Sequence, residues 1–361
     1  MKGFFGRVLL VDLSKKTHSV ERISETVLGG YLGGKGLATQ LLLEKNPPGV
    51  DPLSEENHLI FALGPVTDTP IAGSSRYGVF TKSPLTGFYS ESYSGGKTAE
   101  PISRAGYDAI VLRGKSSSRV FLEISDTSVV FHDANHLWGK GTYETEDAVL
   151  EEVGEKGAKA VVIGPAGENL VRFALIENDY WRSAGRTGVG AVMGSKRVKA
   201  IVFHGGARRE VADPDLVEDF RKKTLAKAKD NPGVAAYKNL GTPMMVALLT
   251  NVASFPTRYW AQGRYEHWQK ISAEAGFWIP AMPSISATHL DFMGKNWQAF
   301  LDVFSVCRKE PQPTIGDMHP RGLEAWQALG EELNGAYGLA KDVEAACKDG
   351  AEAATKILQS S

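Results

Sequence analysis

Three segments of the chain combine glycine with arginine, lysine and small hydroxyl residues, which are residue types that bind phosphate groups. Glycine lets the backbone approach a ligand closely, and a guanidinium donates charge-assisted hydrogen bonds to phosphate oxygens. The segments are residues 31–36 (YLGGKG), residues 73–97 (which include GSSRY, KSPLTG and SYSGGK) and residues 182–196 (RSAGRTGVGAVMGSK). Together they predict a phosphate-bearing cofactor held by neighbouring backbone N–H groups and by Arg76, Arg182 and Arg186.

Each segment alone is also typical of a tight turn with a solvated arginine, and that alternative stays open for any single one. None matches the dinucleotide fingerprint or the P-loop, since residues 185–190 (GRTGVG) resemble the fingerprint only superficially. The third segment follows a β-like run and precedes a short helix, which would place a phosphate at a helix N-terminus. The residue types do not identify the cofactor.

The elements up to about residue 205 predict a mixed β-sheet domain. Short apolar or alternating runs bounded by turn residues indicate strands at 7–13, 58–63, 77–81, 109–113, 120–124, 160–163 and 200–204. One helix is expected over residues 25–44, and another from Thr142, with Thr142, Thr145 and Glu146 as capping residues. Because strands outnumber the helices between them, the pattern favours an α+β fold over a doubly wound α/β fold. No internal repeat is visible in the sequence.

The character of the sequence changes after residue 206. Asp213 and Pro214 predict a helix start, with aspartate as N-cap and proline at the first helical position. Helices are expected over residues 214–229, 234–250, 297–306, 323–333 and 342–358, with a loop at 277–293. We therefore expect a β-rich domain over residues 1–210 and a helical region over residues 211–361.

Composition limits the classes of partner and compartment. The chain has 41 basic and 42 acidic residues, and this balance indicates neither a nucleic acid nor an anionic membrane as partner. No apolar run is long enough to predict a transmembrane helix. The start of the chain lacks the apolar stretch of a signal peptide, and two cysteines, Cys307 and Cys347, do not build a disulfide framework. A cytoplasmic protein is expected.

Many of these segments, in this order, resemble the aldehyde ferredoxin oxidoreductase family. The resemblance covers roughly the first 270 residues and is carried by residues 3–13 (GFFGRVLLVDL), 31–36, 74–87 (SSRYGVFTKSPLTG), 105–110 (AGYDAI), 185–200 (GRTGVGAVMGSKRVKA) and 255–260 (FPTRYW). Members of this family bind tungsten, less often molybdenum, through the dithiolenes of two pterins whose phosphates are bridged by magnesium. They oxidise aldehydes to carboxylic acids and pass electrons through a 4Fe–4S cluster to ferredoxin, and dimers are common among them.

The resemblance also implies which residues contact the cofactor. By position in the motifs these are Arg76, Tyr93, Gly95, Arg182, Ser183, Gly185 and Arg186. The family usually has asparagine where Tyr93 stands and alanine where Ser183 stands. The serine is compatible with a backbone contact, whereas the tyrosine is bulkier than the residue it replaces. The glutamate and histidine proposed as the family's acid and base come from a region that this chain does not match, so no catalytic residue is mapped.

The resemblance breaks at residues 277–293 (FWIPAMPSISATHLDFM). The family has Cys-x-x-Cys-x-x-x-Cys there, and without those thiolates the resemblance does not extend to the 4Fe–4S cluster. Further on, residues 302–307 (DVFSVC) resemble the family's Asp-x-x-Gly-Leu-Cys segment, which implies a pterin contact at Asp302 and a cluster ligand at Cys307. An amphipathic helix with a buried cysteine is the alternative. The chain is shorter than family members, and natural loss, engineering and an incomplete chain all stay open.

Two functions are compatible with these features. The first is an oxidoreductase that converts an aldehyde to a carboxylic acid at a tungsten or molybdenum bis-pterin centre, with ferredoxin or a partner electron-transfer subunit as acceptor. The second is a shortened, non-catalytic pterin- or phosphate-binding protein, or a partner subunit, without the iron–sulfur cluster. Aldehyde-dependent reduction of a viologen dye would separate them.

Overall fold

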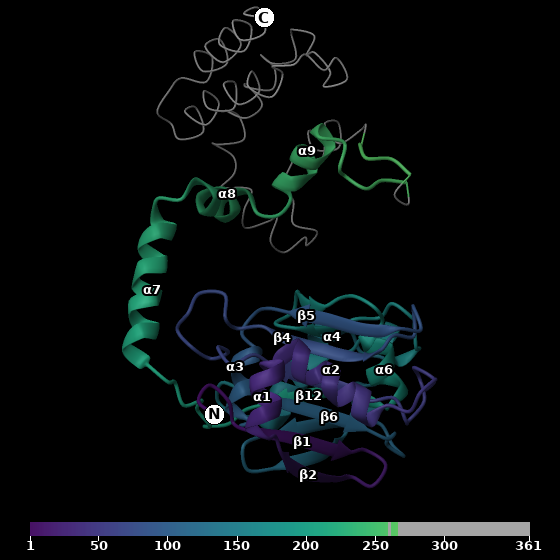
Figure 1. The fold of residues 1–361 in the computed structure, drawn as a ribbon. Helices are drawn as coiled ribbons and strands as arrows, with labels where there is room; N and C mark the ends of the chain where they lie inside the picture. The colour runs from purple at the N-terminus through teal and green to yellow at the C-terminus, as the bar shows by residue number, and fades with distance from the viewer. Residues whose placement is uncertain (259–260, 266–361) are drawn as a thin grey trace, which may run out of the picture. The chain divides into compact units, whose positions relative to one another are not determined.

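The computed structural model describes residues 1–258 and 261–265 of the chain. These residues form two six-stranded sheets with helices, which confirms the predicted α+β fold (Figure 1). The first sheet is formed by β1 (Arg7–Asp12), β2 (Thr17–Arg22), β3 (Leu59–Leu63), β4 (Tyr77–Lys82), β5 (Tyr89–Ser94) and β6 (Ala109–Arg113). The second is formed by β7 (Val120–Ile124), β8 (Val129–Asp133), β9 (Lys159–Val162), β10 (Ile176–Asn178), β11 (Arg182–Ala184) and β12 (Val198–Phe203).

Helices connect and follow the strands. They are α1 (Glu25–Tyr31), α2 (Gly34–Lys45), α3 (Ala99–Arg104), α4 (Thr142–Val153), α5 (Pro165–Glu168), α6 (Val189–Ser195), α7 (Pro214–Lys229), α8 (Pro232–Leu240), α9 (Met244–Asn251) and a 3-10 turn, η1 (Asn135–Leu137). The helix expected over residues 25–44 is two helices, because Leu32 and Gly33 have φ values of 58° and 75° that a right-handed helix does not accommodate. The helix expected over residues 234–250 is likewise interrupted at Gly241, whose φ is 65°.

Each sheet is built by the same succession of elements, so the domain contains a structural repeat. The strand order is β2-β1-β6-β3-β4-β5 in one sheet and, read from its other edge, β8-β7-β12-β9-β10-β11 in the second. Among the described strands, the only parallel pairs are the equivalent ones, β1 with β6 and β7 with β12. The sequence does not reveal this repeat because equivalent strands differ in length and in residue identity, as β5 (YSESYS) and β11 (RSA) do. β5 and β11 occupy equivalent edges of the two sheets.

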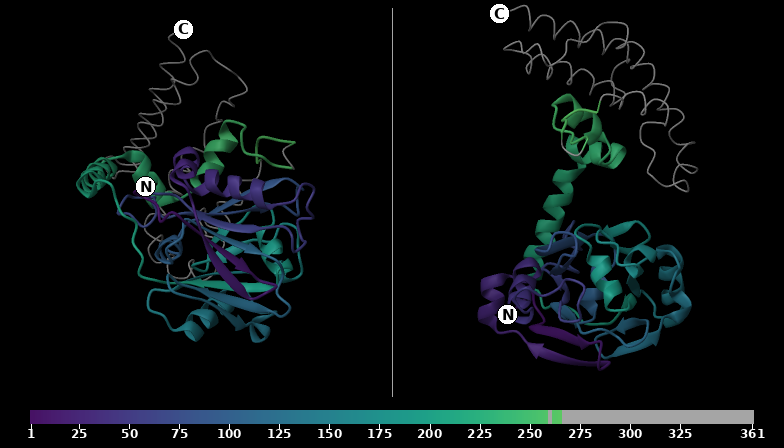
Figure 2. Two further views of the ribbon diagram at one scale, coloured as in Figure 1. Left: turned by 60° about the horizontal axis from the view of Figure 1, so that its bottom comes forward. Right: turned by 90° about the vertical axis from the view of Figure 1, so that its right-hand side faces the viewer.

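The two sheets pack face to face around one core. Strand pleating sends alternate residues of β1 to opposite sides, with Leu9 in the core between the sheets and Leu10 against α2. α2 covers the outer face of the first sheet with Leu37 and Leu41, and α4 covers the outer face of the second with Val149. Figure 2 shows the resulting order of helix, sheet, sheet and helix.

The chain leaves the sheets through a segment anchored by Arg209. Its guanidinium donates to Asp108 Oδ1 at 2.6 Å and lies 4.5 Å from the ring centroid of Phe5. Asp108 is fully buried and also accepts from Gly6 N at 2.7 Å. Gly3 N donates to Glu210 O at 2.7 Å, which ties the exit segment to the start of the chain.

Two predicted helix starts have different outcomes. Leu216 N donates to Asp213 Oδ1 at 2.9 Å, and α7 begins at Pro214, so the predicted aspartate cap is confirmed. α4 begins at Thr142 as expected, but its N-cap is Gly141, whose N–H donates to Glu144 Oε2 at 3.3 Å. The predicted threonine cap is therefore wrong.

The chain divides into two units between residues 228 and 229, so α7 counts almost wholly with the first and α8 and α9 with the second. The domain boundary expected at residue 210 stays a prediction. Asp302, Cys307, Cys347, the helices expected after residue 296 and the loop expected at 277–293 lie outside the described residues. Within the described part of the chain, no helix has the length and apolar character needed to span a membrane.

Candidate functional site

The second and third glycine segments meet where β5 faces the second sheet. Ser90, Ser92 and Ser94 alternate along β5 and point away from its exposed side. Ser92 Oγ accepts from Arg186 N at 3.1 Å, and Ser94 Oγ donates to Asn178 Oδ1 at 2.7 Å. These neutral hydroxyl contacts join residues that are more than 80 positions apart in the sequence.

Asn178 fixes the loop that comes after β5. Its side chain is completely buried, and its Oδ1 also accepts from the Tyr77 hydroxyl at 2.7 Å. Its Nδ2 donates to Gly95 O and to Thr98 Oγ1, each at 3.1 Å. A buried amide with both ends satisfied holds one geometry, so residues 95–98 keep a defined shape.

Arg182 lies directly against this loop. Gly96 has a φ of 88°, and a Cβ there would lie 3.1 Å from Arg182 Cγ and 2.4 Å from Asp179 Oδ2. Asp179 Oδ2 accepts from Lys97 N at 2.7 Å, while its Oδ1 pairs with Lys159 Nζ at 3.0 Å. Burial opposes ionisation of Asp179, but these contacts outweigh it and lower its pKa, so the carboxylate is charged.

The two segments that meet here carry six cationic side chains, and four of them are exposed. The four are Arg76, Lys97, Arg182 and Arg186. Arg76 immediately precedes Tyr77, whose register partner is Ser94, so it is placed opposite the end of β5. Within residues 1–258 and 261–265, none of these four side chains has a hydrogen bond or an ion pair. Unpartnered cations gathered on one edge favour an anionic ligand.

Two of the glycines expected to contact the cofactor are not required by the protein's own packing. A Cβ on Gly95 would meet no atom of the described residues within 4 Å, and one on Gly185 would lie 3.4 Å from Ser183 Oγ. Neither has a φ in the left-handed region. The surface above both is therefore open to a ligand that approaches the backbone, which fits a phosphorylated cofactor.

The start of α6 has a different role. A Cβ on Gly188 would lie 2.0 Å from Arg172 O, and one on Gly190 would lie 2.2 Å from Leu175 O. Gly190 N donates to Ala174 O at 2.9 Å, and the helix is buried along its length. Protein covers this helix N-terminus, so the phosphate expected there does not fit, and these glycines serve packing.

The first glycine segment, residues 31–36, forms the corner between α1 and α2. A Cβ on Gly33 would lie 3.0 Å from Leu63 O, so the corner packs on the end of β3. Lys35 Nζ pairs with Glu91 at 2.8 Å on the outer face of β5. Lys35 is therefore already paired with a carboxylate. Residues 31–36 do not meet the other two segments on the face of β5 that carries Ser90, Ser92 and Ser94, which we call the serine face.

Tyr93 turns its side chain away from the serine face. Its ring packs edge-on against Phe80 with centroids 5.8 Å apart, and its hydroxyl donates to Glu91 Oε2 at 3.1 Å. Burial, with the Glu91 carboxylate, raises the pKa of Tyr93 to about 12, so the hydroxyl is neutral. Only the backbone of Tyr93 remains for a ligand at the end of β5. Ser183, on β11, is half-buried opposite Glu177.

Several residues of this site were not among those selected from the sequence, and Lys97 and Asn178 are two of them. Lys97 lies within the SYSGGK motif, and its type and position were sufficient to include it. Asn178 carried no such signal, because its importance comes from burial between two sheets. The alternating serines at 90, 92 and 94 formed a readable strand pattern that was also missed.

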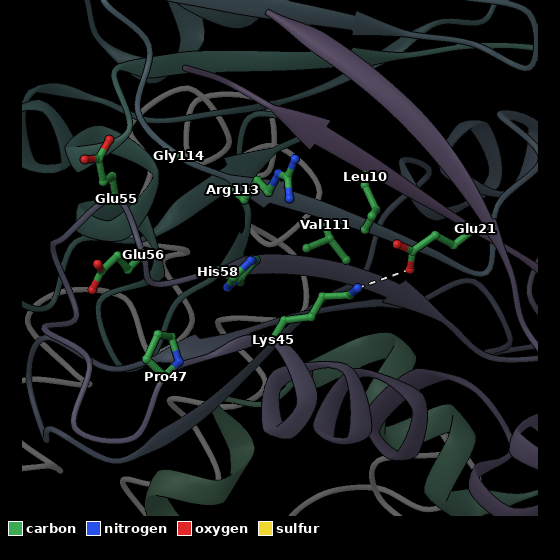
Figure 3. A pocket seen from close by; sticks show the side chains of 10 residues that line it. All are labelled: Leu10, Glu21, Lys45, Pro47, Glu55, Glu56, His58, Val111, Arg113 and Gly114. Atoms are coloured by element: carbon green, nitrogen blue, oxygen red, sulfur yellow. Dashed lines mark hydrogen bonds and ion pairs between the residues drawn. The ribbon is translucent and has the colours of Figure 1, made fainter. Parts of the chain in front are cut away.

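A separate cavity of about 370 Å³ lies on the outer face of the first sheet (Figure 3). Leu10 and Val111 supply its apolar lining, and Lys45 Nζ pairs with Glu21 Oε2 at 3.1 Å across it. Burial, with the nearby Lys196 cation, lowers the pKa of His58 to about 4. None of the expected cofactor contacts lines this cavity. Among the described residues, no group of three His, Cys, Asp or Glu side chains is arranged to hold a metal ion.

Comparison with known proteins identifies the domain. Residues 8–205 match the family model described as "Aldehyde ferredoxin oxidoreductase, N-terminal domain", which is more than half of the chain. The chain belongs to this family. Tungsten-containing aldehyde ferredoxin oxidoreductases of Pyrococcus abyssi and Pyrococcus furiosus are each 39% identical over 349 residues, covering 96% of this chain and 55% of the relative. The chain thus spans about half the length of these relatives.

Two further similarities concern proteins that work as parts of assemblies. A Pyrococcus furiosus "Aliphatic sulfonate oxidoreductase, WOR-like subunit" is 35% identical over 246 residues, covering 63% of this chain and 39% of that protein. The BamBC active-site complex of benzoyl coenzyme A reductase, solved with 1,5-dienoyl-CoA, matches with a TM-score of 0.61 and 40% identity. That match covers 63% of this chain and 35% of the solved chain.

Proposed function

We propose that this chain binds the phosphates of a tungsten or molybdenum bis-pterin cofactor at the edge formed by β5 and β11, for the oxidation of an aldehyde to a carboxylic acid. The observation that carries the proposal is the set of four exposed, unpartnered cations on two segments joined by the β5 serines. Arg76, Arg182 and Arg186 would donate to phosphate oxygens, and Lys97 would add a fourth charge.

The repeated topology supports a ligand with two similar halves. β5 and β11 are equivalent strands, and Gly95 and Gly185 directly follow their last residues. Tyr93 and Ser183 hold equivalent positions one residue before the strand end. The backbone at the two matching strand ends would hold the two pterin phosphates, and the side chain of Tyr93 would not obstruct them because it packs on Phe80.

The metal centre, when bound, supplies the two-electron chemistry, with water as the oxygen source. The residues of this chain bind and orient the cofactor through its phosphates, and the rigid loop at 95–98 keeps the backbone open to close approach. The buried Asn178 and the charged Asp179 maintain that loop without reaching the ligand.

These 361 residues supply no electron exit through a conventional 4Fe–4S cluster. The 361 residues contain two cysteines, and a conventional 4Fe–4S cluster requires four thiolates. The donors present here do not fit such a cluster, so no electron-transfer step is assigned to this chain. Ferredoxin or a partner subunit would accept the electrons, in keeping with the relative named as a WOR-like subunit.

The alternative function is a pterin- or phosphate-binding protein without redox turnover, and the sequence of residues 277–293, which lacks cysteine, favours it. The full chain, expressed anaerobically with tungstate or molybdate, distinguishes the two. Aldehyde oxidation predicts stoichiometric metal and pterin by elemental and fluorescence analysis, with aldehyde-dependent reduction of a viologen dye. Metal and pterin without dye reduction support the binding function, whereas the absence of both metal and pterin overturns the cofactor assignment.

A further inference from the structure

The hairpin turn before Arg182 has an unusual backbone. Asp179 and Tyr180, which join β10 to β11, have φ values of 48° and 62°. Residues other than glycine, asparagine and aspartate rarely adopt this left-handed conformation, and a tyrosine there is strained. Strain of this kind persists only where surrounding contacts hold it, and Arg182 is two residues beyond the strained tyrosine.

A buried carboxylate from α4 holds this turn. Glu146 is 3% exposed; its Oε1 accepts from Asp179 N at 2.9 Å and its Oε2 from Tyr180 N at 3.0 Å. Each carboxylate oxygen therefore bonds one N–H of the two left-handed residues. Burial raises the pKa of Glu146 and the two N–H bonds oppose that rise. A glutamate is rarely buried unless its carboxylate is paired, so the burial of Glu146 reflects its two bonds to the turn.

The turn is coupled to both segments of the candidate site. The Asp179 carboxylate bonds Lys97 N and the Thr98 hydroxyl, at 2.7 and 3.1 Å, so a shift of the turn moves the loop after Gly95. The close approach of Arg182 Cγ to Gly96 places the arginine stem on the same loop. Arg76, by contrast, precedes β4 of the first sheet. β4 pairs with β5, so the position of Arg76 does not depend on the Asp179–Tyr180 turn.

We propose that Glu146 is a positioning residue for phosphate binding, holding the strained Asp179–Tyr180 turn so that Arg182 and the loop at 95–98 face the ligand. This inference rests on the proposed function, because it requires a phosphate-binding edge. Glu146 itself touches no ligand, since its carboxylate is buried and occupied by the two backbone N–H groups.

The test uses the full chain and inorganic pyrophosphate as the probe, with Kd measured by calorimetry and unfolding followed by circular dichroism. Glu146→Gln replaces one acceptor oxygen by an amide that cannot accept a hydrogen bond, so Kd should rise about tenfold. The matched control is Glu151→Gln, an exposed position on the same helix, which should leave Kd unchanged. A lower unfolding temperature with an unchanged Kd for Glu146→Gln would overturn the proposal.

Double variants test whether Glu146 acts through Arg182. If it does, Glu146→Gln should weaken binding less in the Arg182→Gln background than in the unmodified chain, because only its effect through the loop at 95–98 remains, whereas its effect should multiply with that of Arg76→Gln. Full multiplication with both arginines would contradict positioning of Arg182 by Glu146. Absence of pyrophosphate binding by the unmodified chain would overturn the phosphate site, and this inference with it.

A rescue variant separates turn geometry from general damage. Glycine adopts a positive φ without strain, so Tyr180→Gly should restore at least part of the affinity lost in Glu146→Gln. The rescue is assayed in the same double variant, which also remains informative if the single Glu146 substitution fails to fold. A folded double variant whose affinity stays as low as that of Glu146→Gln, or lower, would count against the role of the turn.

Discussion

Two groups of cationic side chains in the first unit differ in what surrounds them. Arg209 and Lys199 are buried and paired, the first with Asp108 and the second with Glu168. The other group is exposed and has no side-chain partner within the described residues: Arg76, Lys97, Arg182 and Arg186. Buried ion pairs hold segments of the fold in place. Unpaired cations repel one another, and a bound anion would neutralise that repulsion. The same residue types thus serve stability in one place and, we infer, binding in the other.

The largest effect expected is from the buried pair. Arg209→Met leaves the Asp108 carboxylate buried without its cation and should lower the free energy of unfolding by about 3–5 kcal/mol. Urea unfolding measures this, with Arg208→Met as control because Arg208 is exposed and lies 3.8 Å from its nearest carboxylate. An equal, small loss in both variants would show that the buried pair does not anchor the exit segment.

Adjacent glycines sharpen the same contrast. Gly96→Ala places a Cβ against Asp179 in a left-handed conformation and should cost on the order of 2 kcal/mol of stability. Gly95→Ala meets open space and should change stability by less than about 0.5 kcal/mol, while weakening pyrophosphate binding. Thermal unfolding and calorimetry on the two variants give both quantities. Equal destabilisation by the two substitutions would contradict the open surface above Gly95.

An exposed cation should show the opposite profile to Arg209. Arg186→Gln should raise the Kd for pyrophosphate about tenfold, or about 1.4 kcal/mol, and leave stability unchanged. The affinity of the variant should also depend less steeply on salt concentration, because one screened charge contact is gone. Arg113→Gln, which removes a cation already paired with Asp12 at 2.9 Å, is the control and should leave binding unaltered. Similar Kd values for both variants would remove Arg186 from the site.

The smallest effect concerns pH at the cavity of Figure 3. The folded-state pKa of His58, about 4, is below its ordinary value of about 6.5, so the unfolded chain binds the extra proton between these values. Its contribution to stability is fully present above pH 6.5 and is lost as pH falls toward 4. Relative to His58→Gln, the loss should be roughly 1 kcal/mol or less, since the ring is partly solvated. Parallel pH-dependent stability curves for the two proteins would refute the depressed pKa.

Buried strands were readable from the sequence, whereas two of the edge strands, β2 and β11, were not. β3 is a continuous apolar run and β12 is apolar except for Lys199, so burial on both faces predicts them directly. β2 is exposed at every position and β11 has three residues, so neither carries a pattern that distinguishes it from a loop. Gly33 and Gly34 indicated the break between α1 and α2, but the amphipathic pattern on both sides of them led to the prediction of one continuous helix.

The sequence predicted which residue types form the candidate site, but it did not predict how they are arranged in space. Glycine and arginine in residues 73–97 and 182–196 indicate an anion, but no local pattern says that β5 and β11 lie together. The proximity of β5 and β11 depends on the packing of two sheets, which no local pattern encodes. The roles of Arg76, Arg182 and Arg186 at the cofactor stay predictions. Asp302 and Cys307 lie outside the described residues and stay predictions too.

The serine contacts of β5 also set an order of events during synthesis. Ser94 bonds a residue 84 positions later, and Ser92 and Ser90 bond residues 94 and 97 positions later. Contacts of such long sequence separation form late, after the entropy of closing a long loop has been overcome. A nascent chain that ends before residue 182 lacks β11, and with it half of the edge that we propose binds phosphate. If the proposed function holds, the cofactor is inserted after the second sheet has docked, and the folded apo-domain is the species that receives it.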